Sequence, residues 1–562
     1  MNFKHIILSL LYATFAVCCT SQQKKVDLLL YNCKILSAST DFSDGYFVAV
    51  NDGKIVSFGN QTEFEKWQVL AKNKIDLQGN YLYPGFIEGH GHFIPFGNSL
   101  MTINLSDTKN WEEVIDAVHQ KIKVSQNGAW VEGRGWHQEK WNQLPKNLIR
   151  GYPTHSDLSA VSTNNPVVLY HASGHALFAN KQAMDLAGVS KETKDPVGGL
   201  IVRDNSGNPT GVFEENAMDI ITNQKDEFAR KIDPEANYDL WKQKALLAQA
   251  QCIENGITSF QDAGTSIEEI AFYKRFIKEG NLKIRISAMI YDSLQNIKTA
   301  GLPIIDYGNN FLTIRAIKTY IDGALGSYGA WLLQPYTDKP NFTGQNTTSL
   351  DTLRAYAEFA KANNLQLCTH AIGDKANREV LNIYEAVLAG DKSLRWRIEH
   401  AQHIHPSDVP RFAKLGVIPS MQAIHCTSDA PFVAKRLGDV RAQDESYLWN
   451  SLWQSGALMA NGTDVPVEGI QPILNFYSTV TRKNNNLLQA FYPEQCLSRK
   501  NALLSITQNN AYASLEETKK GSIKVGGFAD FTVLDTDLIN CSEDRIKTAK
   551  IIRTIVNGVL LK

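Results

Sequence analysis

Two histidines separated by one residue are the first candidates for chemistry in this sequence. They end the short apolar run Pro-Gly-Phe-Ile-Glu-Gly-His-Gly-His at 84–92. In an extended strand, residues i and i+2 point to the same face, so His90 and His92 would present two imidazoles side by side. Paired imidazoles are typical ligands of a transition metal. Because two histidines do not complete such a site, further ligands must come from elsewhere in the chain.

The rest of the chain shows alternating strand and helix patterns. After the strand that carries His90, strands are expected at 257–262, 284–291, 314–322, 365–370, 396–400, 417–422 and 457–464. Helical patterns lie between them, for example at 240–254, 350–362 and 376–388. This alternation predicts parallel strands joined by crossover helices. Eight such units predict an α/β fold of the (β/α)8 TIM barrel type, whose chemistry lies at the C-terminal ends of the strands.

Several of these strands carry a side chain that can bind a metal. Lys318 lies within the fourth strand, whereas His370, His400 and Asp464 end the fifth, sixth and eighth strands. One buried histidine is ordinary in a core, but histidines at the ends of several barrel strands are hard to explain in that way. The sequence therefore predicts one metal site at the barrel rim, with the ligands His90, His92, Lys318, His370, His400 and Asp464.

Both ends of the chain also predict strands. The N-terminal strand patterns lie at 26–35, 47–50, 54–58 and 74–77, and the C-terminal ones at 529–534 and 551–556. The sequence Asn51-Asp52-Gly53 is a hairpin turn signal between two of them. Because strands far apart in sequence can share a sheet, we expect the two ends to build one small β-sandwich.

Residues 93–232 do not fit the barrel pattern and are expected to form a lobe inserted after the first strand. Leaving from the histidine-bearing rim, this lobe could cap the site and shape the substrate pocket. Its His171 and His175 either hydrogen-bond within the lobe or face that pocket. The expected organisation is an N-terminal segment (1–25), a first sandwich part (26–83), the barrel with its lobe (84–498), and a C-terminal helix with the second sandwich part (499–562).

The N-terminus is expected to be a targeting segment. An apolar run of twelve residues at 6–17 is too short for a membrane anchor, which takes about 20 residues. Cys18, Cys19 and a polar stretch follow, so the segment resembles a bacterial lipoprotein signal, in which a cysteine carries the lipid. An ordinary cleaved signal peptide is the alternative, and the sequence does not choose between the two cysteines. The expected location is the periplasm or the outer membrane, with membrane contact through the lipid alone.

Composition narrows the range of partners. The 562 residues include 57 basic and 58 acidic side chains, so nothing indicates nucleic-acid binding. Eight cysteines are present, and none has the Cys-x-x-Cys spacing of a structural zinc site. We expect the six cysteines beyond the N-terminal segment to be buried free thiols. The sequence does not fix the oligomeric state, although it is compatible with a homodimer.

The motifs together resemble the amidohydrolase superfamily, and within it the YtcJ-like branch (amidohydrolase family 3), which also contains N-substituted formamide deformylases. Besides the segment at 84–92, the resemblance rests on Gly-x-Gly-Trp at 133–136, Lys-x-x-x-Asp-Gly at 318–323, Thr-His-Ala-Ile-Gly-Asp at 369–374, Arg-Ile-Glu-His-Ala-Gln at 397–402, Gln-x-x-His at 422–425 and the terminal segment 520–530. It runs from about Val26 to the end of the chain. The chain departs from the pattern at Thr463, where the family has Ser, and at Phe528, where a Lys often stands.

The resemblance implies that the six rim residues bind one or two divalent metal ions, usually zinc. Lys318 would be carboxylated by carbon dioxide, because a carbamate can bridge two metals and an ammonium cannot; a plain ion pair is the alternative for this residue. A metal-bound hydroxide would attack the substrate carbonyl, and Asp464 would take its proton and pass it to the leaving nitrogen. The candidates for the substrate pocket are Arg134, Trp136, His175, Gln422 and His425.

The expected activity is hydrolysis of a C–N bond in a small amide, formamide or cyclic amide, rather than in a peptide. The same site could instead hydrolyse an ester or catalyse a hydration-type step. A surface lipoprotein that binds a ligand without turnover is a second alternative. A metallo-β-lactamase-like hydrolase is a third, but its His-x-His-x-Asp-His motif does not match Phe93-Ile94-Pro95 after His92.

Overall fold

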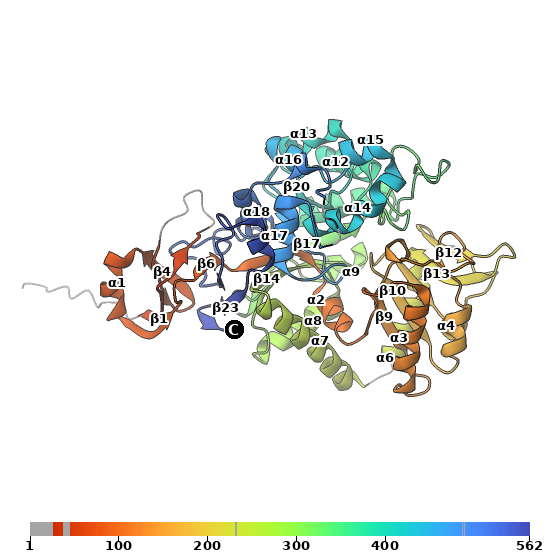
Figure 1. The fold of residues 1–562 in the computed structure, drawn as a ribbon, viewed down its shortest axis with the longest axis horizontal. Coiled ribbons are helices and arrows are strands. Elements are labelled where there is room, and N and C mark those ends of the chain that lie inside the picture. Colours follow the sequence, from red (N-terminus) through yellow and green to blue (C-terminus); the bar gives the residue numbers. More distant parts are fainter. Residues whose placement is uncertain (1–25, 38–44, 231–232, 486, 488) are drawn as a thin grey trace, which may run out of the picture.

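The computed structural model describes residues 26–37, 45–230, 233–485, 487 and 489–562. Cys18, Cys19 and the apolar run before them lie outside this part of the chain. Within it, we find no helix with the length and apolar character that a membrane crossing requires. The barrel occupies the middle of the molecule, with the sheets built from the chain ends on one side and the lobe on the other (Figure 1).

The eight predicted barrel strands are confirmed. They form one parallel sheet in the order β21-β20-β19-β18-β17-β15-β14-β7. Their bounds are β7 (Phe86–Gly91), β14 (Ile257–Thr265), β15 (Arg285–Ile290), β17 (Leu312–Tyr320), β18 (Gln366–Ala371), β19 (Arg397–His400), β20 (Ile418–Met421) and β21 (Ala460–Asn461). A short extra strand, β16 (Ile304–Asp306), pairs antiparallel with β17. Strands such as β15 and β18 are buried along their whole length, as expected when helices cover one face and side chains fill the other.

The first and last barrel strands meet along a seam formed by β7 and residues 461–465. The backbone N–H of Asp464 donates to the carbonyl of His90 at 2.7 Å, and that of His92 donates to the carbonyl of Val465 at 2.8 Å. The buried carboxyl group of Glu88 accepts from the backbone and the hydroxyl of Thr463, at 2.6 and 2.9 Å. Burial raises the pKa of Glu88 to about 8. These contacts nearly close the barrel and align His90 with Asp464.

Helices cover the outside of the barrel. The main ones are α7 (Pro234–Glu254), α8 (Ile267–Lys278), α11 (Leu350–Ala362), α12 (Asp374–Leu388), α13 (Val409–Leu415), α14 (Ala423–Leu437) and α17 (Pro472–Thr481). In α12, the buried residues Val380, Leu381, Tyr384 and Leu388 recur at helical spacing and so form one inward face. A capping box between Ser266 and Glu269 begins α8.

The chain ends form two sheets with a shared core. One sheet has the order β4-β3-β1-β5 and the other β2-β6-β22-β23-β24. Their bounds are β1 (Val26–Tyr31), β2 (Lys34–Ile35), β3 (Phe47–Asn51), β4 (Lys54–Gly59), β5 (Ala71–Asp76), β6 (Tyr81–Pro84), β22 (Phe531–Leu534), β23 (Ile551–Val556) and β24 (Val559–Leu560). The N-terminal β6 pairs directly with the C-terminal β22. Leu30, Val48, Val533 and Ile555 lie in one common cluster.

One predicted strand at the N-terminus is wrong in detail. The segment 26–35 is divided between β1 and β2, which belong to different sheets. The chain turns at Asn32, whose φ of 56° lies in the left-handed region that asparagine tolerates better than most residues. The alternation of apolar residues does not reveal this turn, because apolar residues continue on both sides of it.

Residues between β7 and β14 form a six-stranded sheet of their own, in the order β12-β13-β11-β10-β9-β8. The bounds are β8 (Ile103–Asn104), β9 (Val131–Trp136), β10 (Val167–His171), β11 (Ala176–Ala179), β12 (Gly199–Arg203) and β13 (Pro209–Glu215). We call this sheet, with α3 (Trp111–Lys123) and α6 (Asp219–Arg230), the lobe. A partly buried ion pair holds it on the barrel, since Arg436 of α14 donates to Glu139, which follows β9, at 2.8 Å.

The six described cysteines are all free thiols. Cys33, Cys252, Cys368 and Cys426 are buried as expected, whereas Cys496 and Cys541 are only partly buried. Burial raises the pKa of both Cys33 and Cys426 to about 12, so these thiols are unreactive at neutral pH.

A second ion pair, which is almost fully buried, joins the barrel to the terminal sheets. Arg285 of β15 donates to both carboxylate oxygens of Asp530, at 2.7 and 3.0 Å, and Asp530 also accepts from the backbone of Asn557. Both side chains of the pair are almost inaccessible, at 2% and 4% exposure. Such a bidentate pair fixes orientation as well as distance.

We expect Asp530→Ala to lower the free energy of unfolding by about 3–5 kcal/mol, because it leaves the Arg285 guanidinium buried without its counter-ion. Urea-induced unfolding followed by tryptophan fluorescence measures the change. Asp185→Ala is the control, because its pair with Lys181 is exposed and should contribute about 1 kcal/mol or less. Equal effects of the two substitutions would contradict the prediction.

Candidate metal centre

His90 and His92 lie at the end of β7 and face Asp464. The Nε2 atom of His92 lies 3.2 Å from Asp464 Oδ1, and the Nε2 atom of His90 lies 3.6 Å from the same oxygen. Burial lowers the pKa of His90 to about 4, so its imidazole is neutral at pH 7, which is the form that binds metals. The ligand atoms of these three residues lie within 4.8 Å of one another. That separation suits a shared cation.

Asp464 occupies the centre of the group. Its φ of 59° is left-handed, and the seam hydrogen bond to His90 holds it in this conformation. Burial alone would raise the pKa of Asp464, but the imidazoles beside it, His92 first, outweigh burial and hold that pKa well below its usual value. Asp464 is therefore an anion that faces the nitrogen atoms of several imidazoles.

Lys318, His370 and His400 lie at the same rim. Lys318 is 1% exposed, and burial lowers the pKa of its ammonium group. The ring of His400 lies 4.4 Å from that of His370 and 5.1 Å from that of His90, measured between centroids. The structure therefore brings together all six residues that the sequence predicts as ligands.

Several buried polar atoms in this group of side chains have no hydrogen-bond partner in the described part of the chain. Among the described residues, the buried atoms without a hydrogen-bond partner include His90 Nε2, Lys318 Nζ, His370 Nε2, His425 Nε2 and Asp464 Oδ1. Buried polar atoms without partners are rare and costly, so five around one point indicate a missing ligand. Imidazole nitrogens and a carboxylate are donors that suit zinc and similar divalent metals. The residues thus fit a metal ion.

A second layer of side chains orients the histidines. The Nδ1 atom of His90 lies 2.5 Å from Glu399 Oε2, and Arg397 also contacts this carboxylate, at 2.7 Å. Burial would raise the pKa of Glu399, but Arg397 and His90 hold it below its usual range. The Nδ1 atom of His400 donates to Gln422 Oε1 at 2.7 Å. Both contacts leave the Nε2 atoms free to bind a metal.

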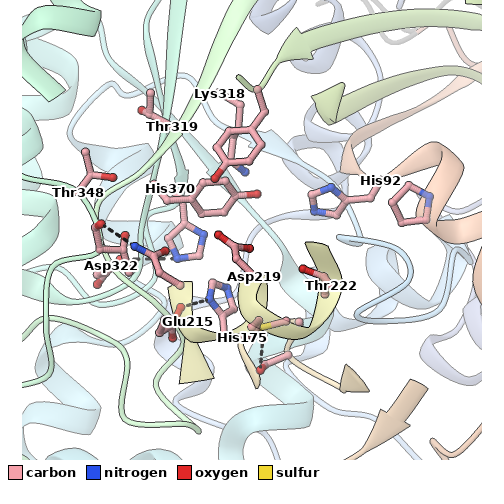
Figure 2. Close-up of a pocket in the computed structure, with 18 of the residues that line it drawn as sticks. His92, His175, Glu215, Asp219, Thr222, Lys318, Thr319, Asp322, Thr348 and His370 are labelled. Carbon is pink, nitrogen blue, oxygen red and sulfur yellow. Dashed lines mark hydrogen bonds and ion pairs between the residues drawn. The ribbon is translucent and has the colours of Figure 1, made fainter. Parts of the chain in front are cut away.

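The site opens into a cavity of about 890 Å3 between the barrel and the lobe (Figure 2). The barrel contributes His92, Lys318, Tyr320, His370, His400 and Asp464, and the lobe contributes Arg134, His175, Glu215 and Asp219. The guanidinium group of Arg134 donates to the carbonyls of Pro466 and Ala172. Arg134 and His175 therefore lie where the sequence analysis expects pocket residues.

The other three expected pocket residues do not line this cavity. Trp136 is fully buried in the lobe, where its indole N–H donates to the carbonyl of Leu169 at 2.8 Å. Gln422 lies behind His400. His425 borders a separate cavity of about 50 Å3, which also touches His400 and Asp464. Within the lobe, His171 hydrogen-bonds internally to Ser173 and Gln138, as one of the two sequence interpretations expected.

Sequence reasoning missed Glu215, which ends β13 and lines the cavity. Its carboxylate lies 2.8 Å from His175 Nδ1, and the His175 ring lies 4.9 Å from that of His370 (Figure 2). Glu215 is also in a left-handed conformation, with a φ of 52°. No Cβ fits at Gly323 or Gly329, because it would lie 1.8 or 2.2 Å from a Glu215 oxygen. The glycine after Asp322 in the Lys-x-x-x-Asp-Gly motif is the only signal that pointed to this contact.

A model described as the amidohydrolase family matches residues 74–561. The chain belongs to the amidohydrolase family. Its relatives include the putative amidohydrolase YtcJ of Bacillus subtilis, 28% identical over 92% of this chain and 95% of that protein. This likeness places the chain in the YtcJ-like branch.

Two further proteins are similar to this chain over almost its whole length. Protein LONG AFTER FAR-RED 3 of Arabidopsis thaliana is 31% identical over 91% of this chain and 87% of its own length. The N-substituted formamide deformylase of Arthrobacter pascens is 26% identical over 95% of this chain and 98% of its own length. Among solved structures, an uncharacterized metal-dependent hydrolase of Pyrococcus horikoshii aligns with a TM-score of 0.75 at 26% identity, covering 92% of this chain and 99% of that one. The amidohydrolase is thus similar to metal-dependent hydrolases over almost its whole length.

We expect Glu399→Gln to weaken zinc binding by about 10–100-fold, because a neutral amide no longer fixes the His90 imidazole or raises its basicity. Competition with a chromophoric chelator measures the dissociation constant. The matched control is Glu385→Gln, which changes an exposed carboxylate of α12. Unchanged affinity in Glu399→Gln would show that His90 needs no such partner.

Proposed function

We propose that this chain is a metal-dependent amidohydrolase that cleaves a non-peptide C–N bond in a small amide, formamide or cyclic amide. The observation that carries the proposal is the group of unpartnered donor atoms beside Asp464, at the floor of the 890 Å3 cavity. A cavity of this size fits a small organic substrate. The metal donors and the open space therefore lie in the arrangement that hydrolysis requires.

One or two divalent ions, of which zinc suits the donors best, would be held by His90, His92, Lys318, His370, His400 and Asp464. When bound, such an ion activates water and polarises a carbonyl group. Lys318 would serve as a carbamate. Burial favours its neutral amine, which is the form that reacts with carbon dioxide, and no described side chain accepts a hydrogen bond from Nζ.

Asp464 is the residue that we assign to proton transfer. Its Oδ1 atom lies beside both histidines of β7, so it can accept a proton from water held there. Asp464 also lines the large cavity, so the same carboxyl group can pass this proton to the leaving nitrogen. Arg134 and His175 face the cavity from the lobe and would orient the substrate over the site.

The relatives support a formamide as the first substrate to test, because one of them is named an N-substituted formamide deformylase. In our proposal the lobe caps the rim and sets specificity, while the two terminal sheets form a β-sandwich away from the chemistry. Ester hydrolysis by the same site and ligand binding without turnover remain the rival functions. Substrate turnover separates all three.

We expect the wild-type protein, purified with bicarbonate, to contain close to two metal ions per chain and to release formate from an N-substituted formamide. Lys318→Ala should lose metal, because it removes the proposed bridge, and Asp464→Asn should lower kcat by about 100-fold or more. Elemental analysis and a formate assay over a panel of formamides, amides and esters are the measurements.

The control for this experiment is Lys361→Ala, which changes a lysine on the outer helix α11. Equal metal content in Lys318→Ala and the wild type would exclude the carbamate bridge. Metal-replete protein that binds but does not convert any member of the panel would favour the ligand-binding alternative.

We also propose that the protein is exported and anchored by lipid at Cys18 or Cys19. We expect labelled palmitate to be incorporated when the gene is expressed in a bacterium, and incorporation to be lost when both cysteines are changed to serine. Metabolic labelling followed by immunoprecipitation tests this. Release of an unlabelled mature protein would instead indicate an ordinary cleaved signal peptide.

A further inference from the structure

His425 is a buried side chain that the rim ligands predicted from the barrel strands do not include. It lies in the first turn of α14, directly after β20, and is 7% exposed. Its Nε2 atom has no hydrogen-bond partner among the described residues and lies 3.7 Å from Asp464 Oδ2. A buried imidazole nitrogen that lies beside a carboxylate and has no hydrogen-bond partner is in the environment expected of a metal ligand.

His400 and His425 present their rings side by side. The two ring planes differ by only 12°, and their centroids are 6.0 Å apart. The ligand atoms of His400, His425 and Asp464 all lie within 4.8 Å of one another. These side chains also border the 50 Å3 cavity, so open space lies beside them. One cation between them could contact all three.

Asp464 faces this group with a different oxygen from the one that it turns to β7. Its Oδ1 atom lies near His92, whereas its Oδ2 atom lies near His425. A carboxylate can bind two metal ions through its two oxygens. Asp464 is therefore placed to join the group of His90 and His92 to the group of His400 and His425.

The start of α14 is fixed in the orientation that this role requires. Gln422 directly precedes the helix, and its amide contacts both the His400 ring and the carbonyl of Ser420. The next two backbone N–H groups donate to the side chains of Asn461 and Asn475. The start of α14 thus supplies both Gln422, whose amide orients His400, and His425 beside it. Supporting hydrogen bonds of this kind preorganise metal ligands.

We propose that His425 is a metal ligand, and that His400, His425 and Asp464 together bind a divalent cation. This inference rests on the proposed metal-dependent function and adds a ligand from the helix that follows the seventh barrel strand to those predicted from the sequence. The other role open to His425 is to hydrogen-bond Asp464 and position it without contacting metal.

The test compares zinc and cobalt binding to the full mature protein and to three variants. We expect His425→Gln to lose one of two cations, or to weaken the binding of one by about 100-fold or more, and to change the visible absorption of the Co2+-loaded protein. His425→Glu should restore binding, because a carboxylate can replace an imidazole as a ligand whereas the isosteric amide cannot. His403→Gln is the control, since His403 is also buried but is hydrogen-bonded to Ser446 and Gln402.

Each other outcome overturns the inference in a recognisable way. If His425→Gln binds both cations with wild-type affinity and spectrum, His425 is not a ligand, although the proposed function stands. If His403→Gln loses as much metal as His425→Gln, the loss reflects damage to the fold. If the wild type binds no divalent cation, the proposed function fails together with this inference.

Discussion

The seam between the first and last barrel strands is the constraint on which the site depends. His90 and Asp464 belong to segments at opposite ends of the barrel sequence, and they become neighbours only because Asp464 donates its backbone N–H to His90. Two hydrogen bonds from Thr463 to the Glu88 carboxyl group fasten the same junction. The threonine that replaces the usual serine retains the hydroxyl, so the departure from the family pattern keeps this contact. Without the seam, the two imidazoles of β7 would have no carboxylate partner.

Much of the site could be predicted because barrel topology converts sequence order into proximity. Side chains at the C-terminal ends of parallel strands meet at one rim, so Lys318, His370, His400 and Asp464 could be assigned from strand boundaries alone. The residues that orient them could not. Glu399 immediately precedes His400, and simple alternation would send the two side chains to opposite faces. The φ of 72° at His400 breaks this alternation, so both residues approach His90.

The misplacement of Trp136 has a similar cause. Arg134 and Trp136 are two residues apart in β9, so regular alternation would point both into the pocket. Gly135 has a φ of 109°, and the register between β9 and β10 shifts at this point. Arg134 consequently faces the cavity while Trp136 packs inside the lobe. Such an irregularity depends on tertiary contacts that no local pattern reports, and the same holds for the lobe-to-barrel contacts of Glu139 and Arg436.

The pairing of β6 with β22 also has a consequence for the order in which the molecule can be assembled. The Tyr83 hydroxyl donates to the carbonyl of Thr536, 453 positions further along the chain. At roughly 5–20 residues per second, a ribosome needs about 20–90 s to synthesise that distance. Throughout this interval the N-terminal strands lack their partner and expose one edge. Completion of the fold is thus delayed until almost the last residues have emerged, which makes the nascent chain dependent on protection of that edge.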